Sequence, residues 1–308
     1  MKIRLGYVGL SKTINITSSK TITYTNYLKD KNLNKINDLI ITNLTNLKEL
    51  LTYNVKNNIH FFRITSKLIP LATKEDISFD YIKPYQKNYK EIAQIISKNK
   101  LRVDVHPDQF AILNSTKKEI VNNTFNILKY HYKILNALKV KNKIIILHIG
   151  SSVLGKDNSI KRFINNFNKL PKYIKECIAL ENDDKVFSAL DTLRLCQSLN
   201  IPMILDYHHH ICNYSEVAFK EIFETWKNIN PKIHFSSPKN KTKKDFRSHN
   251  DYIDSSSFIS FLEEIKSLNF DIDIMLEAKA KDEALFRLIR ELKYKTNYKF
   301  IDDTSFLI

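Results

Sequence analysis

The chain repeats one pattern eight times: a short apolar or alternating segment, a few polar residues typical of a turn, and then a longer amphipathic stretch. Alternation with a period of two residues indicates a strand, and apolar residues spaced three and four apart indicate a helix. Strands that alternate with helices favour parallel pairing, because each helix returns the chain to the same end of the sheet. The expected strands are Lys2–Tyr7, His60–Ile64, Leu101–His106, Lys143–His148, Cys177–Glu181, Pro202–Asp206, Lys232–Phe235 and Ile272–Glu277.

The amphipathic stretches between these segments predict helices that cover the strands. The clearest has apolar residues at helical spacing between Ile36 and Leu51. The other expected helices cover 81–98, 118–138, 159–175, 186–199, 216–228, 256–268 and 282–293. No Gly/Ser-rich linker and no change of composition divides the chain, so we expect one domain over residues 1–308. The predicted fold is α/β, a (β/α)8 TIM barrel, with an open doubly wound sheet as the alternative.

Histidines and carboxylates gather at the C-terminal ends of the expected strands. Six of the nine histidines lie at or just beyond such an end, namely His106, His148, His208, His209, His210 and His234. His249 lies in the loop after the seventh strand, and Glu181, Asp206 and Glu277 each end a strand. In a TIM barrel the C-terminal rim carries the active site, because the loops that leave the strands converge there.

These rim residues predict a metal cluster, because neutral imidazoles together with carboxylates suit Mn²⁺ or Zn²⁺. The candidate ligands are His106, His148, Glu181, Asp206, His209, His234, His249 and Glu277. Eight ligands exceed the demand of one ion, so we expect two or three ions, with Glu181 and Glu277 able to bridge neighbours. One such histidine alone would be explained more simply as a hydrogen-bonded core or surface residue.

The run from Asp206 to His210 needs a change of direction to serve this cluster. Alternation along a strand turns the side chains of Asp206, His208 and His210 one way and that of His209 the other. A bend after Asp206 would bring His209 back beside it. We expect His208 and His210 either to support the ligands from behind or to face solvent.

Two charged residues share the inward face of expected strands with candidate ligands. Asp104 would lie inside the barrel, where it would orient a ligand imidazole unless the strand is bulged. Lys232 begins the seventh strand two residues before His234. A buried ammonium beside metal ions is costly, so Lys232 should be neutral, modified or displaced. A solvated lysine at the start of the strand is an equal alternative.

The charge of the chain favours a polyanionic partner. Lys and Arg number 49 against 33 Asp and Glu, and the resulting net charge of +16 attracts nucleic acid, although lysines spread by a biased composition give the same number. One basic loop follows the seventh strand, on the rim, where it would hold a phosphodiester backbone; its cations are Lys239, Lys241, Lys243, Lys244 and Arg247. On the same rim, Gln109 and Phe110 would form a wedge for a distorted base pair, unless Phe110 belongs to the core.

Other functions are excluded by the motifs that the sequence lacks. Its four glycines cannot form a dinucleotide-binding fingerprint, and the run 150–157 fails as a P-loop because Asp157 stands where Ser or Thr must bind magnesium. Its three cysteines have no paired spacing, which argues against disulfides and a thiolate zinc site. No apolar run is long enough to cross a bilayer, and the N-terminus fits a strand better than a signal peptide. We expect a soluble, cytoplasmic monomer without a nucleotide cofactor and without membrane contact.

Seven motifs, in order along the chain, resemble those of the UV damage endonuclease family. They are His106–Phe110, His148–Gly150, Leu180–Asp183, Asp206–His210, Lys232–Ser236, Ser248–Tyr252 and Met275–Lys279. The resemblance extends from Arg4 to Lys279. It implies a TIM barrel with a divalent metal cluster, typically manganese, that nicks double-stranded DNA immediately 5′ to a photolesion. The products would carry a 3′-hydroxyl and a 5′-phosphate.

The resemblance carries the family's ligands onto the same eight residues that rim placement selects. It also implies that Lys232 becomes carboxylated, that Gln109 and Phe110 probe the lesion, and that Tyr7 lies near it. The departures from the family pattern are Phe110 for Tyr, Ser11 for Asn and Lys74 for His. These departures concern contacts near the lesion or the surroundings of one metal, and they leave the eight main ligands in place.

The chemistry that follows is metal-assisted hydrolysis of a phosphodiester, with Glu181, Glu277 and Lys232 as catalytic groups. An apurinic-site endonuclease with the same barrel is the nearest alternative. A metal-dependent sugar isomerase or epimerase is more distant, because of the basic rim and the surplus of ligands. A damaged-DNA binding module without turnover is disfavoured by the intact ligand set.

Overall fold

The computed structural model of the protein, which describes residues 1–242 and 245–308, contains a closed barrel of eight parallel strands. They are β1 (Lys2–Val8), β4 (Phe61–Ile64), β5 (Arg102–Val105), β6 (Ile145–His148), β7 (Ile178–Glu181), β8 (Met203–Asp206), β9 (Lys232–Phe235) and β10 (Ile272–Leu276). They follow one another around the barrel in this order, and β10 pairs with β1 to close it. The prediction of a (β/α)8 TIM barrel is confirmed, and every expected strand is present.

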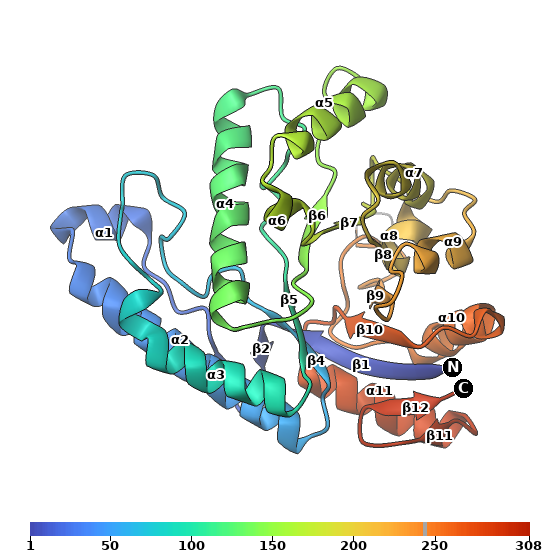
Figure 1. Cartoon of the computed structure of the whole chain (residues 1–308). Coiled ribbons are helices and arrows are strands. Elements are labelled where there is room, and N and C mark those ends of the chain that lie inside the picture. The colour runs from blue at the N-terminus through green and yellow to red at the C-terminus, as the bar shows by residue number, and fades with distance from the viewer. Residues whose placement is uncertain (243–244) are drawn as a thin grey trace.

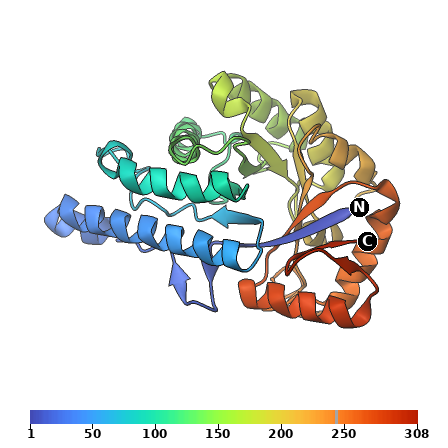
Figure 2. The same ribbon diagram turned by 60° about the horizontal axis from the view of Figure 1, so that its bottom comes forward.

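Helices surround the barrel and cover the outer face of the sheet (Figure 1 and Figure 2). They are α2 (Leu33–Lys56), α3 (Gln86–Lys98), α4 (Lys118–Ala137), α5 (Lys156–Asn168), α6 (Lys172–Lys175), α7 (Ala189–Leu199), α9 (Phe219–Glu224), α10 (Ser255–Ile265) and α11 (Asp282–Lys295). The apolar core fills the shell between the strands and these helices, as the buried Ile36, Ile40 and Leu44 of α2 illustrate. The single helix expected over 159–175 is two helices, because Pro171 cannot continue α5 and instead begins α6.

Several short elements were not predicted. They are α1 (Tyr24–Asp30), α8 (Tyr207–Cys212), the β2 (Leu10–Ser11) and β3 (Ile16–Thr17) hairpin, the 3₁₀ turns η1 (Lys83–Tyr85) and η2 (Lys266–Leu268), and β11 (Lys299–Phe300) with β12 (Ser305–Leu307). The β11–β12 hairpin pairs with β1 and brings the two ends of the chain together (Figure 1), where the Ile308 N–H donates to the Met1 carbonyl. Within the described residues, every helix is too short or too polar to span a bilayer.

The inside of the barrel holds a column of alternating charges, here called the interior charge ladder. From the N-terminal end of the strands to the rim it comprises Arg4 and Arg102 with Asp273, then Lys232 and Arg63 with Asp104, then Glu277. Arg4 donates twice to Asp273 at 2.6 Å, and Arg102 Nη1 donates to the same carboxylate at 2.7 Å. Burial opposes ionisation of Asp273, but the two guanidinium groups hold the pKa of this carboxyl below its usual value. Each charge in the ladder is therefore compensated by its neighbours.

Acid should destabilise the protein partly through His131, a histidine of α4 that packs against the ring of Tyr130. Burial lowers the pKa of His131 to about 3. The unfolded chain therefore binds a proton that the folded chain excludes, and stability is lost as the pH falls from about 6.5 toward the folded pKa. We expect the unfolding free energy of His131→Gln relative to wild type to rise by about 1.4 kcal/mol per pH unit below pH 6. Urea titrations at pH 7, 6 and 5 measure this difference, and a difference that does not change with pH would contradict it.

Candidate active site

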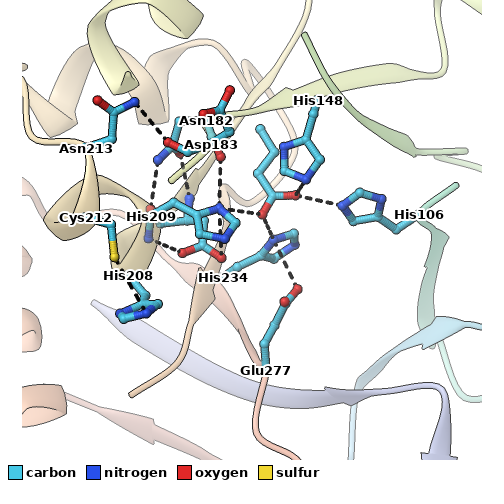
Figure 3. A network of polar contacts seen from close by, with 12 residues as sticks. His106, His148, Asn182, Asp183, His208, His209, Cys212, Asn213, His234 and Glu277 are labelled. Carbon is cyan, nitrogen blue, oxygen red and sulfur yellow. Dashed lines mark hydrogen bonds and ion pairs between the residues drawn. The ribbon is translucent and has the colours of Figure 1, made fainter. Parts of the chain in front are cut away.

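Glu181, the last residue of β7, joins histidines from three other strands at the C-terminal rim. Its Oε2 lies 2.9 Å from His106 Nε2 and 3.8 Å from His148 Nε2. Its Oε1 lies 2.8 Å from His234 Nδ1. The three imidazoles converge from the ends of β5 and β6 and from β9 (Figure 3). Each oxygen of the Glu181 carboxylate therefore faces at least one imidazole.

Two groups of side chains are close enough to hold a cation, and Glu181 belongs to both. The first group consists of His106, His148 and Glu181, and the second of Glu181, Asp206, His234 and Glu277. Within each group the ligand atoms lie within 4.8 Å of one another. This arrangement fits a cluster in which Glu181 bridges neighbouring ions.

The remaining two candidate ligands lie at the edge of these groups. The bend that the sequence requires after Asp206 is present, because β8 ends there and Asp206 caps the start of α8 by accepting from the His209 N–H at 2.8 Å. His209 Nδ1 then lies 3.7 Å from both Asp206 Oδ2 and Glu181 Oε1. His249, in the loop after β9, places Nδ1 4.0 Å from Glu277 Oε2. The fold therefore brings all eight candidate ligands to one place.

Backbone carbonyls orient two of the imidazoles. The Nδ1 atoms of His106 and His209 lie 2.9 Å from the Pro107 carbonyl and 3.0 Å from the Asn182 carbonyl, so each Nδ1–H donates there. The Asn182 side chain also bonds both the N–H and the C=O of Asp206, at 2.9 and 3.0 Å. Since Nδ1 is engaged by a carbonyl, Nε2 is the ring nitrogen left to face a cation, which would displace any proton that it carries.

Arg63 of β4 is a site residue that sequence reasoning missed. Its Nη1 donates to Glu277 Oε1 at 2.6 Å, its Nη2 lies 2.5 Å from His234 Nε2, and its Nε lies 3.8 Å from Asp104. Only 11% of its side chain is exposed. The guanidinium is therefore a positive charge held among groups that can bind a cation. A lone arginine in the otherwise apolar strand Phe61–Ile64 was the available signal.

The three carboxylates of the cluster differ in their affinity for a proton. Burial would raise the pKa of Glu277, but the charge of Arg63 outweighs it and holds this pKa below its usual range. His234 has the same effect on the pKa of the buried Glu181. Burial raises the pKa of Asp206, and the charges of Glu181 and Glu277 raise it further. Asp206 Oδ2 is buried and has no hydrogen-bond partner among the described residues. The site is therefore short of positive charge.

Lys232 and Asp104 form a buried ion pair below the cluster. The alternative of a solvated lysine is therefore wrong. Asp104 lies in a regular ladder between β4 and β5, without a bulge, and its charged partners are Lys232 and Arg63 rather than a ligand imidazole. Burial lowers the pKa of Lys232 to about 8 against the opposing charge of Asp104.

Gln109 and Phe110 lie on the surface in the loop between β5 and α4. Phe110 is 74% exposed, so the alternative of a core phenylalanine is wrong. Tyr7, in contrast, is fully buried under α2, and its hydroxyl donates to Asn54 Oδ1 at 2.7 Å. The structure places Tyr7 in the core and does not bring it to the surface of the rim.

The basic loop after β9 is described in part, since Lys243 and Lys244 lie outside the described residues. Lys239 and Lys241 are exposed. Lys239 Nζ lies 3.4 Å from Asp245, and Arg247 Nε lies 3.5 Å from Asp184. Carboxylates of the protein thus already neutralise part of the charge of this loop.

Two of the positions that depart from the expected pattern, Ser11 and Lys74, contact residues other than the candidate ligands. Ser11 is buried and donates to Asp282 at 2.6 Å. Lys74 is exposed, and its Nζ lies 5.1 Å above the ring of Tyr24. His208 and His210 are buried, so the alternative in which they face solvent is wrong. His208 lies beside Cys212 (Figure 3), and its ring centroid is 5.8 Å from that of the candidate ligand His249.

The known proteins that are similar to this chain in sequence share one description. A sequence model of the family described as UV-endonuclease UvdE matches residues 3–305. A UV DNA damage endonuclease of Bacillus cereus (strain B4264) is 40% identical over 303 residues, which cover 95% of each sequence. A protein of the same description from Bacillus anthracis (strain A0248) is 38% identical over 316 residues and 99% of each sequence.

Solved structures agree with these relatives. The crystal structure of SacUVDE matches with a TM-score of 0.86 and 32% identity, over 95% of this chain and 98% of that one. Endonuclease IV from Thermus thermophilus matches with a TM-score of 0.59 and 12% identity, over 95% of this chain and 100% of that one. The second match shows a likeness of fold alone.

Proposed function

The chain belongs to the UV-endonuclease UvdE family, a family of DNA repair nucleases, and on this basis we propose that it nicks double-stranded DNA immediately 5′ to UV photolesions. The products carry a 3′-hydroxyl and a 5′-phosphate. The observation that carries the proposal is the position of Glu181, which is shared by both cation-binding groups at the barrel rim. The exposed Phe110 extends from the same rim, four residues after His106.

The donor set fits two or three divalent cations, and we propose that they are manganese, because a mixture of imidazole and carboxylate suits Mn²⁺ as well as Zn²⁺. One buried polar atom, Asp206 Oδ2, has no hydrogen-bond partner among the described residues and is available to a cation. The residues proposed to hold the ions are His106, His148, Glu181, Asp206, His209, His234, His249 and Glu277. Bound cations supply Lewis acidity that activates water and neutralises the charge developing on a phosphodiester.

The other residues of the rim bind and orient the DNA. Gln109 and Phe110 contact the lesion, where unstacking is already cheap. Lys239, Lys241 and Arg247, together with Lys243 and Lys244, hold the phosphate backbone by charge. Lys232 lies below the cluster, buried against Asp104, and burial lowers its pKa to about 8, so we propose that it can release or hold a proton near neutral pH. We propose that a monomer is sufficient, because one chain contributes every one of these groups.

A labelled duplex with one defined photodimer tests this proposal. Purified protein with Mn²⁺ should make a single nick on the 5′ side of the dimer, and EDTA should abolish it. Undamaged and abasic duplexes of the same sequence are the controls. Cleavage of the abasic duplex alone would favour an apurinic-site endonuclease. Binding of the photodimer duplex without cleavage, at confirmed metal content, would leave a recognition module and refute the catalytic proposal.

A further inference from the structure

The loop between β6 and α5, residues 149–155, ends in two exposed apolar side chains that the function proposed above does not use. Val153 is 52% exposed and Leu154 is 71% exposed. The loop follows His148, so it leaves the same rim that carries the candidate ligands. This segment also contains the near-match to a P-loop, which the sequence excludes as a nucleotide site. Its apolar tip therefore needs another explanation.

The backbone at Leu154 is strained. The Gly155 N–H donates to the Ser152 carbonyl at 2.9 Å, which closes a four-residue turn, and Leu154 occupies its third position with φ of +65°. That position favours Gly or Asn, because a side chain with a Cβ clashes with the backbone there. A leucine in this conformation is a true outlier and costs about 1 kcal/mol or more.

Other residues with positive φ show why Leu154 is unusual. Eleven non-glycine residues of the described chain have this conformation, and nine of them are Asn or Lys. The tenth, Leu71, is partly buried and packs against the core, which gives its side chain a structural role. Leu154 gains no such packing, since most of its side chain faces solvent. Folding therefore gains nothing from a leucine at this position, and strain of this kind is typical of functional sites.

The protein nevertheless holds this loop firmly. The Val153 carbonyl accepts from Arg162 Nη2 at 2.5 Å and from the Ser159 hydroxyl at 3.1 Å. The Leu154 carbonyl accepts from the Asn158 side chain at 2.9 Å. Because the backbone is fixed on both sides of the tip, the leucine side chain is presented to solvent in one place.

The same interactions join this loop to the loop that carries Phe110. The Asn114 side chain bonds both the N–H and the C=O of Ser151, at 3.0 and 2.7 Å. Arg162 Nε donates to the Asn114 carbonyl at 2.8 Å, so one guanidinium bonds both loops. Gly150 allows this approach, since a Cβ there would lie 2.6 Å from Asn114 Oδ1. The loop that carries Leu154 is therefore bonded to the end of the loop that carries Phe110.

We propose that Leu154 is a second apolar wedge, which enters the damaged duplex together with Phe110. Two apolar tips on loops that are bonded to each other suit a base step that is already distorted, because inserted apolar side chains replace the stacking that the lesion weakens. The exposed cations Lys117 and Lys118, which follow the first loop, and Lys161 of α5 match the charge of the flanking phosphates. Lys156 is also exposed, but its Nζ already pairs with Asp191 at 2.8 Å. This inference rests on the proposed function, since it names a further contact with the same DNA.

The variant Leu154→Asn separates the strain from the recognition, because Asn tolerates positive φ and is polar. We expect its Tm to rise by about 1 to 3 °C. We expect its preference for a photodimer duplex over an undamaged duplex, measured as the ratio of Kd values in EDTA, to fall about tenfold. Leu154→Met should keep most of the wild-type preference. Ile301→Asn, which removes an exposed apolar side chain from the β11–β12 hairpin, is the control and should leave the preference unchanged.

Each other result has a distinct meaning. A Leu154→Asn protein that is more stable and keeps the full preference would overturn the wedge. Equal losses in Leu154→Asn and Leu154→Met would also overturn it, because they would implicate the backbone rather than the apolar side chain. A change of sedimentation at micromolar concentration, with unchanged DNA binding, would assign the tip to a second copy of the chain instead. A wild-type protein without preference and without nicking would refute the proposed function itself.

Discussion

Glu181→Gln is expected to lower the rate of nicking at a photodimer by about 10³-fold or more. Glu181 is the one residue common to both cation-binding groups, and each of its two oxygens is within 2.9 Å of an imidazole nitrogen. An amide offers a single acceptor oxygen and no charge, so it cannot join the two groups. Nicking assays with Mn²⁺ measure the rate, and calorimetric titration measures how much Mn²⁺ affinity is lost.

The damaged-DNA affinity of Glu181→Gln should remain close to that of wild type, because Phe110 and the basic loop lie outside the cluster. Glu176→Gln is the matched control, since this exposed carboxylate lies at the end of α6, before the opposite end of the same strand, and should leave nicking unchanged. Nicking at the wild-type rate by Glu181→Gln with bound metal verified would refute the role given to this carboxylate.

Arg63→Gln should have the largest effect on stability, and the effect should depend on divalent metal. In the absence of metal, the guanidinium compensates Glu277 directly and Asp104 at longer range. Removing one partner from buried ionic groups leaves uncompensated charge, which costs about 3 to 5 kcal/mol. We expect this loss in urea unfolding with EDTA. The loss should be clearly smaller with saturating Mn²⁺, because the cations then supply positive charge beside Glu277.

Arg287→Gln provides the comparison for Arg63→Gln. Arg287 pairs with Glu291 on the surface of α11, where half of its side chain is exposed. Exposed pairs of this kind contribute below about 1 kcal/mol, with or without metal. An equal loss of stability for Arg63→Gln in EDTA and in Mn²⁺ would show that its charge does not substitute for a cation.

The features set by local pattern were predictable from the sequence. Strand alternation located the eight strands, and the rule that TIM-barrel loops converge at one rim located the candidate ligands. The bend after Asp206 was required by the alternation itself, because His209 would otherwise point away from Asp206. The structure realises it through an N-cap, and a helix places residues three apart on one face.

The features set by contacts across the barrel were not predictable in the same way. Arg63 meets Glu277, which is 214 positions away in the sequence, and no local pattern reports that distance. The partner of Asp104 was missed for the same reason, since Lys232 lies on a strand that does not adjoin β5. Tyr7 is a different case. Arg4 points into the barrel, so alternation along β1 turns Tyr7 outward toward α2.

The interior charge ladder has a consequence for how the strands find their alignment. If a strand pairs with its neighbours one residue out of register, its inward and outward side chains exchange places. Such a shift is excluded, because the charged side chains of the ladder must point inward. A shift by two residues keeps the faces, and apolar pattern alone does not exclude it. The order of charges does exclude it, because a two-residue shift of β5 would bring Arg102 to the level of Lys232 in place of Asp104.

In that shifted arrangement Arg102 and Lys232 would face each other without Asp104 between them. The free energy of this arrangement would be far higher than that of the native pairing. The order of positive and negative charges along the barrel axis therefore fixes how far each strand is shifted relative to its neighbours. Because His106 and His234 continue the same two strands, an error in that stagger would also misplace the imidazoles at the rim. The ion pairs inside the barrel therefore help to position the candidate ligands at its C-terminal rim.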